Sequence, residues 1–333
     1  MPERAFFYAI FNNKGGRLKC PYYIMMRSMK NTHIEHPEDS ILNGDLNVLN
    51  WFSANSKVSV KIDGAPAIVW GRNPATGNFF VGTKSVFNKV KIKINESHED
   101  INNNHDGNVA EILHDCFDFL PRTDRIFQGD FIGNGGDYVY RPNTITYKFP
   151  EVIDSEIIIA PHTEYFAEKD LRDAISYPLQ SRLNDTLDVL FVVPDVKVSP
   201  NLDDIKDVCN FAKQIATLCE FPEQKIVNRV KKQLNRCIRE GLEIDDITLE
   251  ALANDNSMDV NVLRLWKLVE SIKMDMFCYL HPDDSIQCEL SGKNTDHEGY
   301  VMHNQFGIFK IVDRETFSYH NFNLSPMNRK GDA

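Results

Sequence analysis

The sequence lacks several features that would fix a class of protein. No run approaches the roughly 18 consecutive apolar residues that a transmembrane helix needs. The N-terminal stretch has neither the basic lead nor the cleavage pattern of a secretory signal. The seven cysteines include no C-x-x-C pair, so neither a zinc ribbon nor a disulfide framework is indicated. We therefore expect a cytoplasmic protein with reduced thiols and no membrane partner.

Positive charge is scarce overall. The 37 Lys and Arg residues against 48 Asp and Glu residues give a net charge of -11. Neutralisation of phosphates needs clustered cations, so this balance argues against a protein that grips nucleic acid over its whole surface. A local basic patch is still allowed. The 333 residues, 42% hydrophobic and 26% charged, suffice for one large globular domain or two smaller ones.

Hydrophobic periodicity divides the chain into a β-rich part and a helical block. Residues 57–95 have a period of two, which predicts a meander of antiparallel strands. Helical spacing governs residues 201–280, and the β pattern resumes at residue 285. We predict an N-terminal lead-in element (residues 1–50), a β domain formed by residues 51–200 and 281–333, and a helical insertion (residues 201–280).

Two other segments carry local expectations. Residues 96–107 are polar and rich in Asn, His and Asp, which predicts an exposed loop. After Val312, apolar residues recur in a loose β-like pattern at Phe317, Tyr319, Phe322 and Leu324.

The most informative residue of the sequence is a lysine between two apolar strands. Val58-Ser59-Val60 runs into the turn Lys61-Ile62-Asp63-Gly64, and a second apolar strand follows. Burial of an ammonium group disfavours its charged form, so we expect the pKa of Lys61 to be lowered and its amine to be a nucleophile. Single charged residues also interrupt other apolar segments, as in a cleft lined by a sheet. These residues are Lys84, Asp130, Glu298 and Lys310.

These residues carry a resemblance to a known superfamily. Lys61-x-Asp63-Gly64, Gly129-Asp130, Glu298-Gly299-Tyr300-Val301 and Phe309-Lys310-Ile311 resemble motifs I, III, IV and V of the covalent nucleotidyltransferases. That superfamily contains the ATP-dependent DNA and RNA ligases and the mRNA capping enzymes, and the similarity is greatest to phage RNA ligase-like proteins. Thr83-Lys84-Ser85 stands at the place of motif Ia. The resemblance implies an α+β fold whose nucleotidyltransferase domain has two packed antiparallel sheets, here with a helical insertion.

The resemblance implies a role for each basic motif residue. Lys61 would attack the α-phosphate of ATP and form a lysyl-AMP. Asp63 and Gly64 would shape the turn that holds it. Lys84 and Lys310 would neutralise the charge that builds on the phosphates.

The acidic and aromatic motif positions have implied roles as well. Asp130 would hydrogen-bond the ribose, although the family usually has the longer Glu there. Glu298 would hold Mg²⁺ or Mn²⁺, since a hard cation prefers carboxylate oxygen. Tyr147 fits the spacing of the aromatic that stacks on the base, but a core role explains it equally well. The strand predicted at residues 156–160 ends without an aromatic.

The sequence also departs from the family pattern. Motif V usually has two lysines one residue apart, whereas Lys310 is followed by Ile311 and Val312, with Arg314 as a possible substitute. Pro66 stands where DNA ligases tend to carry an arginine. The 21 residues after Val312 are too few for the small barrel that DNA ligases and capping enzymes place there. These departures favour RNA over DNA as the substrate.

A basic ridge is predicted on the insertion helix between Pro222 and Gly241. Its cations recur at spacings of four and three, so they share one face beside an apolar stripe. Such a face is a candidate contact for a nucleic-acid backbone, and it is also common as an ordinary solvated face. The ridge consists of Lys225, Arg229, Lys232, Arg236 and Arg239.

The resulting prediction is an ATP-dependent polynucleotide ligase that joins 5′-phosphate to 3′-hydroxyl ends through lysyl-AMP, with RNA favoured over DNA. Two alternatives stay open. One is another lysyl-nucleotidyl transferase, such as a DNA ligase or a GTP-using capping enzyme, and the other is a degenerate nucleotide-binding module. By resemblance, the protein acts in the cytoplasm of a phage-infected host. The sequence leaves the oligomeric state open.

Overall fold

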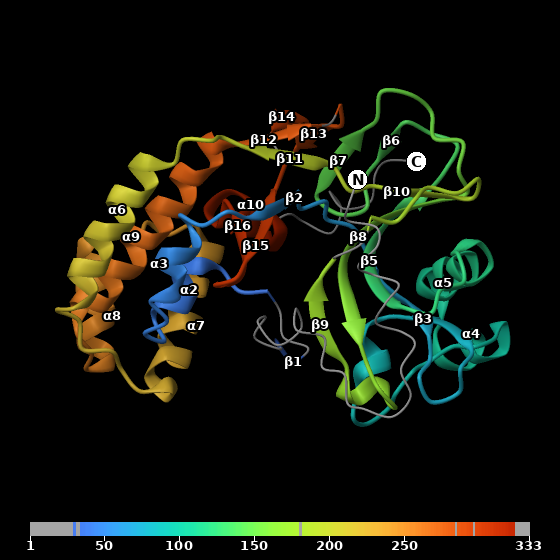
Figure 1. Cartoon of the computed structure of the whole chain (residues 1–333), viewed down its shortest axis with the longest axis horizontal. Helices are drawn as coiled ribbons and strands as arrows, with labels where there is room; N and C mark the ends of the chain where they lie inside the picture. The colour runs from blue at the N-terminus through green and yellow to red at the C-terminus, as the bar shows by residue number, and fades with distance from the viewer. Residues whose placement is uncertain (1–28, 31–33, 180–181, 284, 296, 324–333) are drawn as a thin grey trace, which may run out of the picture.

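Most helices gather at one end of the molecule, and most strands lie at the other end together with the helices of residues 98–119 (Figure 1). The computed structural model describes residues 29–30, 34–179, 182–283, 285–295 and 297–323, so residues 1–28 of the predicted lead-in element lie outside the described part. The protein is α+β, as predicted. None of the described helices is both long and apolar enough to cross a membrane.

Sheet A forms one side of the sheet region. Its strands have the order β1-β9-β8-β5-β3-β4, with antiparallel pairing between these neighbours, and β10 joins β8 in parallel. β8 continues past residue 160, where the predicted strand ended. The strands of sheet A are β1 (Met29–Lys30), β3 (Ala67–Arg72), β4 (Phe79–Gly82), β5 (Ile126–Asn134), β8 (Ile157–Phe166), β9 (Ile175–Pro178) and β10 (Val189–Phe191).

Sheets B and C complete the β structure, and their pairs are antiparallel. Sheet B has the order β12-β11-β2-β15-β16, and sheet C has the order β14-β13-β7-β6. Sheet B contains β2 (Lys57–Val60), β11 (Asp195–Val198), β12 (Leu280–Asp283), β15 (Gly299–Asn304) and β16 (Gly307–Val312). Sheet C contains β6 (Val139–Tyr140), β7 (Ile145–Lys148), β13 (Gln287–Leu290) and β14 (Lys293–Thr295).

The meander predicted for residues 57–95 is wrong in its first strand. β2 pairs with β15 and β11 in sheet B, whereas β3 pairs with β4 and β5 in sheet A. A period of two reports that one face of a strand is buried, but it does not identify the neighbouring strand. The chain therefore crosses from one sheet to the other directly after β2, at Lys61.

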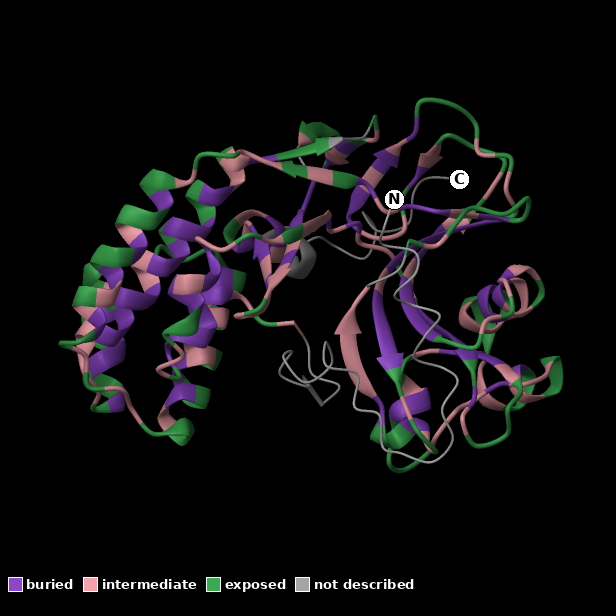
Figure 2. Cartoon of the chain, in the orientation of Figure 1, coloured by how far each residue is buried: buried purple, intermediate pink, exposed green. Residues whose placement is uncertain are grey.

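Helices occupy the predicted insertion, and their apolar sides face one another (Figure 2). α7 ends at Gly241, whose left-handed φ of 67° is the usual C-terminal geometry for glycine. A continuous hydrophobic core joins Leu234 of α7 and Trp266 of α9 to Met302 and Ile311 of sheet B. The insertion helices are α6 (Asp203–Ala216), α7 (Gln224–Glu240), α8 (Asp246–Asn256) and α9 (Val260–Met276), followed by the short η3 (Phe277–Tyr279).

The chain ends of the described part also pack on these helices. α2 (Pro37–Ile41) contacts α9, α3 (Asn47–Trp51) contacts α6, and α10 (Arg314–Asn323) contacts α7. The β-like pattern predicted after Val312 is thus wrong where the structure describes it, because Asp313 caps a helix: its carboxylate accepts from the Thr316 N–H at 3.1 Å.

The polar segment at residues 96–107 is not a simple loop. It contains α4 (His98–Asn104), and α5 (Gly107–Phe119) follows. Ser97 caps α4 by accepting from the Asp100 N–H at 3.1 Å, and the Ser97 hydroxyl donates to the Asp100 carboxylate at 2.9 Å. These caps stabilise a helix that the polar composition concealed. Two short 3₁₀ turns, η1 (Lys84–Phe87) and η2 (Leu171–Asp173), complete the fold.

Candidate functional site

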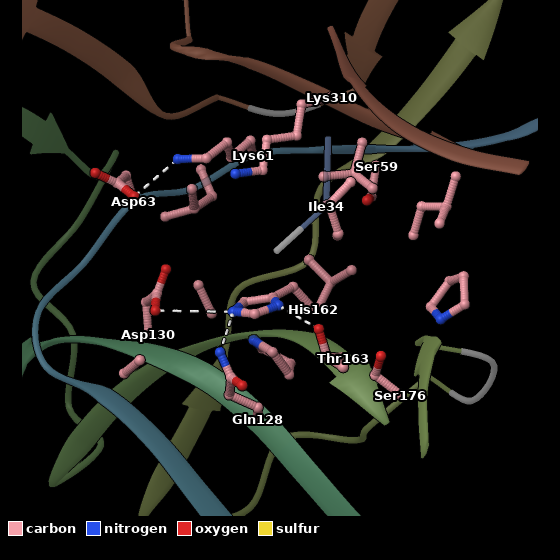
Figure 3. A pocket seen from close by; sticks show the side chains of 18 of the residues that line it. Ile34, Ser59, Lys61, Asp63, Gln128, Asp130, His162, Thr163, Ser176 and Lys310 are labelled. Carbon is pink, nitrogen blue, oxygen red and sulfur yellow. Dashed lines mark hydrogen bonds and ion pairs between the residues drawn. The ribbon is translucent and has the colours of Figure 1, made fainter. Parts of the chain in front are cut away.

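A cavity of about 420 Å³ lies between sheets A and B. β2 and β16 form one wall, and β5, β8 and β9 form the other (Figure 3). Charged residues from distant parts of the sequence meet there, as the sequence analysis expected of a cleft. They are Lys61, Asp63, Lys84, Asp130 and Lys310.

Lys61 occupies the crossing point between the two sheets. Its backbone N–H donates to the Gly299 carbonyl at 2.8 Å, which extends the pairing of β2 with β15 by one residue. Its Nζ donates to Asp63 Oδ1 at 2.8 Å and to Glu298 Oε2. The Lys61 side chain is 17% exposed, so the ammonium group sits in the cavity wall between two carboxylates.

These two carboxylates reverse the pKa shift that burial alone would cause. Burial lowers the pKa of Lys61, but the charges of Glu298 and Asp63 outweigh it and hold the pKa above its ordinary value. The prediction of a lowered pKa is therefore wrong for the protein without ligand. Burial raises the pKa of Glu298, while Lys61 acts in the opposite direction. Lys61 must lose a proton before it can attack, and Asp63 and Glu298 are the carboxylates in contact with it.

Lys310 and Lys84 bring further positive charge to the cavity. Burial and the charge of Lys61 lower the pKa of Lys310, which lies in β16. Lys84 begins η1, where Thr83 Oγ1 accepts from the Ser85 N–H at 3.3 Å. Within the described ranges, neither lysine forms an ion pair. Two cations without carboxylate partners make this part of the cavity suited to an anion.

Hydrogen bonds from β7 of sheet C and from the residues just before β7 fix the turn after Lys61. The Tyr147 hydroxyl accepts from the Asp63 N–H at 2.8 Å, and Asn143 Nδ2 donates to Asp63 Oδ2 at 2.5 Å and to the Asp63 carbonyl at 3.2 Å. A Cβ atom at Gly64 would lie 2.4 Å from the Phe131 carbonyl oxygen, so only glycine fits. The position of Asp63 beside Lys61 is thus fixed by contacts outside the cavity.

Tyr147 does not have the place predicted for a base-stacking aromatic. It is buried in β7 and does not line the cavity. Burial raises the pKa of its phenol, which keeps the hydroxyl protonated as it holds the turn. The sequence analysis did not select Asn143. Its position as a polar residue just before a buried strand could have indicated a role in holding the turn. The aromatic side chains that do line the cavity include Phe87 and Tyr165, whose ring centroids are 4.4 Å apart.

Asp130 lies on the sheet A wall among residues that the sequence analysis did not select. His162 Nε2 lies 3.7 Å from Asp130 Oδ1 and 3.3 Å from Gln128 Nε2 (Figure 3). Gln128 Oε1 in turn accepts from the Tyr165 hydroxyl at 2.7 Å. Gln128 and Asp130 are two residues apart in β5, so strand alternation could have placed them on one face. His162 and Tyr165 were missed because β8 was predicted to end too early.

Other predicted cations lie outside the cavity lining. Arg314, suggested as a second motif V cation, is buried and donates to Glu38 Oε1 at 2.9 Å and to Asp39 Oδ1 at 3.0 Å, which excludes that substitution. The residues of the basic ridge are all exposed on α7, and Arg236 pairs with Glu240 at 2.8 Å. The ridge comprises Lys225, Arg229, Lys232, Arg236 and Arg239.

The site has a limited set of ligands for a divalent cation. Asp63 and Glu298 converge on Lys61, but no group of three or more His, Cys, Asp or Glu suited to a metal occurs in the part of the chain that is described. Mg²⁺ is often held by one or two carboxylates together with water and substrate phosphates. The pair therefore fits a cation that arrives with a polyphosphate, bound by Asp63 and Glu298.

Comparison with known proteins identifies the family of the chain but does not indicate a reaction. A family model matches residues 31–249 and, in an overlapping segment, residues 206–326. No curated protein matches the sequence, and no solved structure matches it. The two matched segments together include every residue of the cavity lining. The chain belongs to a family of unknown function, DUF6267.

Proposed function

We propose that the protein is an ATP-dependent polynucleotide ligase that acts through a lysyl-AMP at Lys61, with RNA favoured over DNA. AMP would pass from Lys61 to a 5′-phosphate, and a 3′-hydroxyl would then displace it. The observation that carries the proposal is the convergence of Lys61, Asp63 and the cations Lys84 and Lys310 at one cavity, with Glu298 in contact with Lys61 from outside the cavity lining. The nucleotidyltransferase fold itself is part of the proposal.

The first step uses the groups around Lys61. The Lys61 Nζ lone pair attacks the α-phosphorus of ATP, and an N–P bond forms as the bond to the β-phosphate oxygen breaks. Pyrophosphate leaves with that electron pair, and Asp63 and Glu298, the two carboxylates in contact with Lys61, are the acceptors for the proton that Lys61 loses. Lys84 and Lys310 neutralise the charge that develops on the phosphate oxygens. Mg²⁺ or Mn²⁺, held by the carboxylate of this pair that stays ionised, would add positive charge at the same phosphates.

The cavity is suited to a nucleotide in size and lining. Its volume of about 420 Å³ falls within the range of roughly 300–1,000 Å³ that is usual for small-molecule sites. Apolar side chains such as Phe87 and Ile308 line its walls together with the charged groups. A lining with both apolar and cationic side chains matches a ligand that carries a base and phosphates.

A nucleotide-binding module without turnover is the second candidate. Two observations favour it: the ammonium of Lys61 is paired with two carboxylates, and Arg314 does not replace the missing second lysine of motif V. In that case the cavity would bind a nucleotide reversibly, and Lys61 would contribute only charge.

Labelling with α-labelled nucleotide separates these functions. The protein is incubated with ATP or GTP and Mg²⁺ and then run on a denaturing gel. We expect a labelled band with ATP that is absent in Lys61→Ala and in Lys61→Arg, which keeps a cation beside Glu298 without a usable amine. A band with GTP alone would favour a capping reaction. No band with either nucleotide, together with binding detected by calorimetry, would contradict the ligase and favour the binding module.

A further inference from the structure

A loop with an excess of positive charge lies at the rim of the cavity. It comprises residues 88–93, directly after η1, and we call it the basic loop. Asn88 at its start lines the cavity, as does Lys84 in η1. Between Asp63 and Glu96 the sequence has five Lys and Arg residues and no acidic residue. In a chain with a net charge of -11, such a concentration of cations is exceptional.

Hydrogen bonds fix the base of the basic loop. The Ser85 carbonyl accepts from the Asn88 N–H at 3.1 Å and from the Lys93 N–H at 3.4 Å, so both ends of the loop meet at η1. Lys93 Nζ donates to the Asn104 carbonyl, and Asn104 Nδ2 donates to Asn95 Oδ1 at 2.9 Å. The loop is therefore held at a defined place beside the cavity.

The tip of the basic loop presents both charge and apolar surface to solvent. Lys89 and Lys91 are exposed, and Val90 between them is 77% exposed. Lys91 has a left-handed φ of 56°, which is uncommon for a residue other than glycine and persists where the surrounding structure holds it. Within the described part of the chain, neither lysine of the tip pairs with an acid. Their charges are thus available to an anionic partner.

The chemistry of the tip matches a single-stranded polynucleotide. Each nucleotide of a strand carries one phosphate, which a lysine can neutralise. The bases of a single strand are also accessible, whereas a duplex encloses their faces, so an exposed apolar side chain between two lysines has a surface to contact. Under the proposed function, the adjoining cavity receives the end of a strand. The backbone next to that end would pass over the rim where the basic loop lies.

We propose that the basic loop binds the backbone of a single-stranded polynucleotide whose reacting end enters the cavity. This inference rests on the proposed function for the identity of the strand. Lys89 and Lys91 neutralise phosphates, and Val90 contacts a base or sugar between them. The anchored base of the loop keeps these three side chains beside the cavity, so the strand is held where its end can react.

The test measures binding of a fluorescein-labelled single-stranded RNA with a 5′-phosphate by anisotropy at several salt concentrations. Lys89→Gln with Lys91→Asn removes both charges, and Asn adopts the left-handed conformation more readily than most residues. Each phosphate contact contributes about 0.7 to the slope of log K against log[salt], so we expect the slope to become shallower by about 1.4. At about 0.1 M salt this change corresponds to a loss in affinity of about ten- to thirtyfold. Lys89→Arg with Lys91→Arg keeps both charges and should retain the wild-type slope.

Two further variants separate charge from apolar contact. Lys57→Gln with Lys293→Gln is the matched control, because it removes the same charge from exposed lysines that do not line the cavity. It should leave the slope unchanged. Val90→Ser should lower the affinity by about threefold at an unchanged slope, since it removes apolar surface and no charge. Thermal unfolding of each variant checks that the fold is intact.

Three results would overturn the inference. One is an unchanged slope in the variant with Lys89→Gln and Lys91→Asn, and another is an equal change in the control pair. The third is competition by polyglutamate as strong as that by unlabelled RNA of the same charge, because the loop would then recognise an acidic polymer of any kind.

Failure of this inference and failure of the proposed function give different results. If the wild type forms no lysyl-AMP but the slope depends on Lys89 and Lys91, the ligase is contradicted and the strand contact stands. If lysyl-AMP forms and the slope is independent of these lysines, the role of the basic loop alone is contradicted.

Discussion

Two clusters of charge in this protein differ in what surrounds them. The Lys61 cluster (Lys61, Asp63 and Glu298) lies in a cavity wall, with side chains that are 10–29% exposed. The Glu38 cluster (Glu38, Asp39, Lys273 and Arg314) is more deeply buried, with side chains that are 0–12% exposed. Both place acids against cations, but among the described residues only the Lys61 cluster shares a cavity with further lysines that have no carboxylate partner.

The Glu38 cluster has additional donors and acceptors around it. Glu38 Oε1 accepts from Lys273 Nζ at 2.8 Å and from Arg314 at 2.9 Å. Trp266 Nε1 donates to Asp39 at 3.2 Å, and Arg314 also donates to Asn235. These bonds join α2 to α7, α9 and the start of α10. Glu38 Oε2 is buried without a hydrogen-bond partner, but the other bonds tie the two acids and two bases to four helices, which favours a structural role.

The Lys61 cluster is open by comparison. Its two carboxylates share a single lysine, and Lys310 and Lys84 face the same cavity. The comparison teaches that burial and ion pairing alone do not mark a reactive lysine, since Lys273 has both. Under the proposed function, what distinguishes Lys61 is its position in a cavity that also contains two lysines without a carboxylate partner, Lys84 and Lys310. The predictions below test this distinction.

Replacement of the two lysines by methionine should separate stability from activity. Removal of one partner from a buried ion pair costs about 3–5 kcal/mol, so we expect Lys273→Met to lower the free energy of unfolding by that amount. Lys61→Met should cost less than Lys273→Met, because Asp63 lines the cavity and its side chain is 29% exposed. Urea unfolding followed by circular dichroism measures both. An equal loss of unfolding free energy in the two variants would contradict the proposed difference between the clusters.

Lys310→Met should lower the rate of lysyl-AMP formation with little effect on folding. A preorganised charge aimed at the developing transition-state charge is worth about 10²–10³-fold in rate. Because burial lowers the pKa of Lys310 and no carboxylate partner is lost, its removal should not destabilise the fold. Single-turnover kinetics and thermal unfolding give the two readouts. Lys57→Met, an exposed cation of β2, is the control. A rate equal to that of Lys57→Met would remove Lys310 from the site.

Acid should weaken the Glu38 cluster over a defined pH range. Burial raises the pKa of Glu38, but Lys273, His36 and Arg314 outweigh it and lower the pKa from 4.5 to about 2. A lowered acid pKa contributes stability above the ordinary value, and that stability is lost as pH falls towards the folded value. Between pH 4.5 and 2 we expect a loss of about 3 kcal/mol. Unfolding free energies of wild type and Glu38→Gln should converge over this range, and parallel curves would contradict the assignment.

Charge reversal on α7 should have the smallest effect. Lys232→Glu with Arg236→Glu should weaken binding of a single-stranded RNA by about tenfold, since fewer phosphates are neutralised, and should leave lysyl-AMP formation unchanged. Lys206→Glu with Lys293→Glu is the matched control, because both are exposed and the change in net charge is the same. Fluorescence anisotropy at fixed salt measures the binding. Unchanged affinity, or an equal loss in the control pair, would identify the basic ridge as an ordinary solvated face.

The sequence predicted the features that depend on local pattern. The α+β class, the helical character of residues 201–280 and the meeting of Lys61 with Lys84, Asp130 and Lys310 at one cavity follow from periodicity and motif order. The pairing of β2 with β15 does not, because alternation leaves the partner strand unspecified. Tyr147 was ambiguous for a similar reason, since a buried aromatic has the same spacing in a core as in a cavity wall.

Long-range partners account for the other failures. Arg314 looked available for phosphate because its partner Glu38 is far away in the sequence. The pKa of Lys61 was predicted to fall because burial was visible in the pattern, whereas the approach of Glu298 was not. α4 and α10 were missed because single capping residues, Ser97 and Asp313, stabilise helices in segments with weak periodicity. The roles of Arg314 and Lys61 therefore depend on side-chain partners that are distant in the sequence, which a local pattern does not reveal.

The most direct test of the central claim is the chemical state of Lys61 after exposure to ATP and Mg²⁺. Wild-type protein is incubated, digested and analysed by mass spectrometry at neutral pH, which preserves a phosphoramidate. We predict a mass increase of one AMP on the peptide that contains Lys61, and its loss on addition of pyrophosphate. An unmodified Lys61 in protein that binds ATP, or AMP found on another residue, would contradict the account.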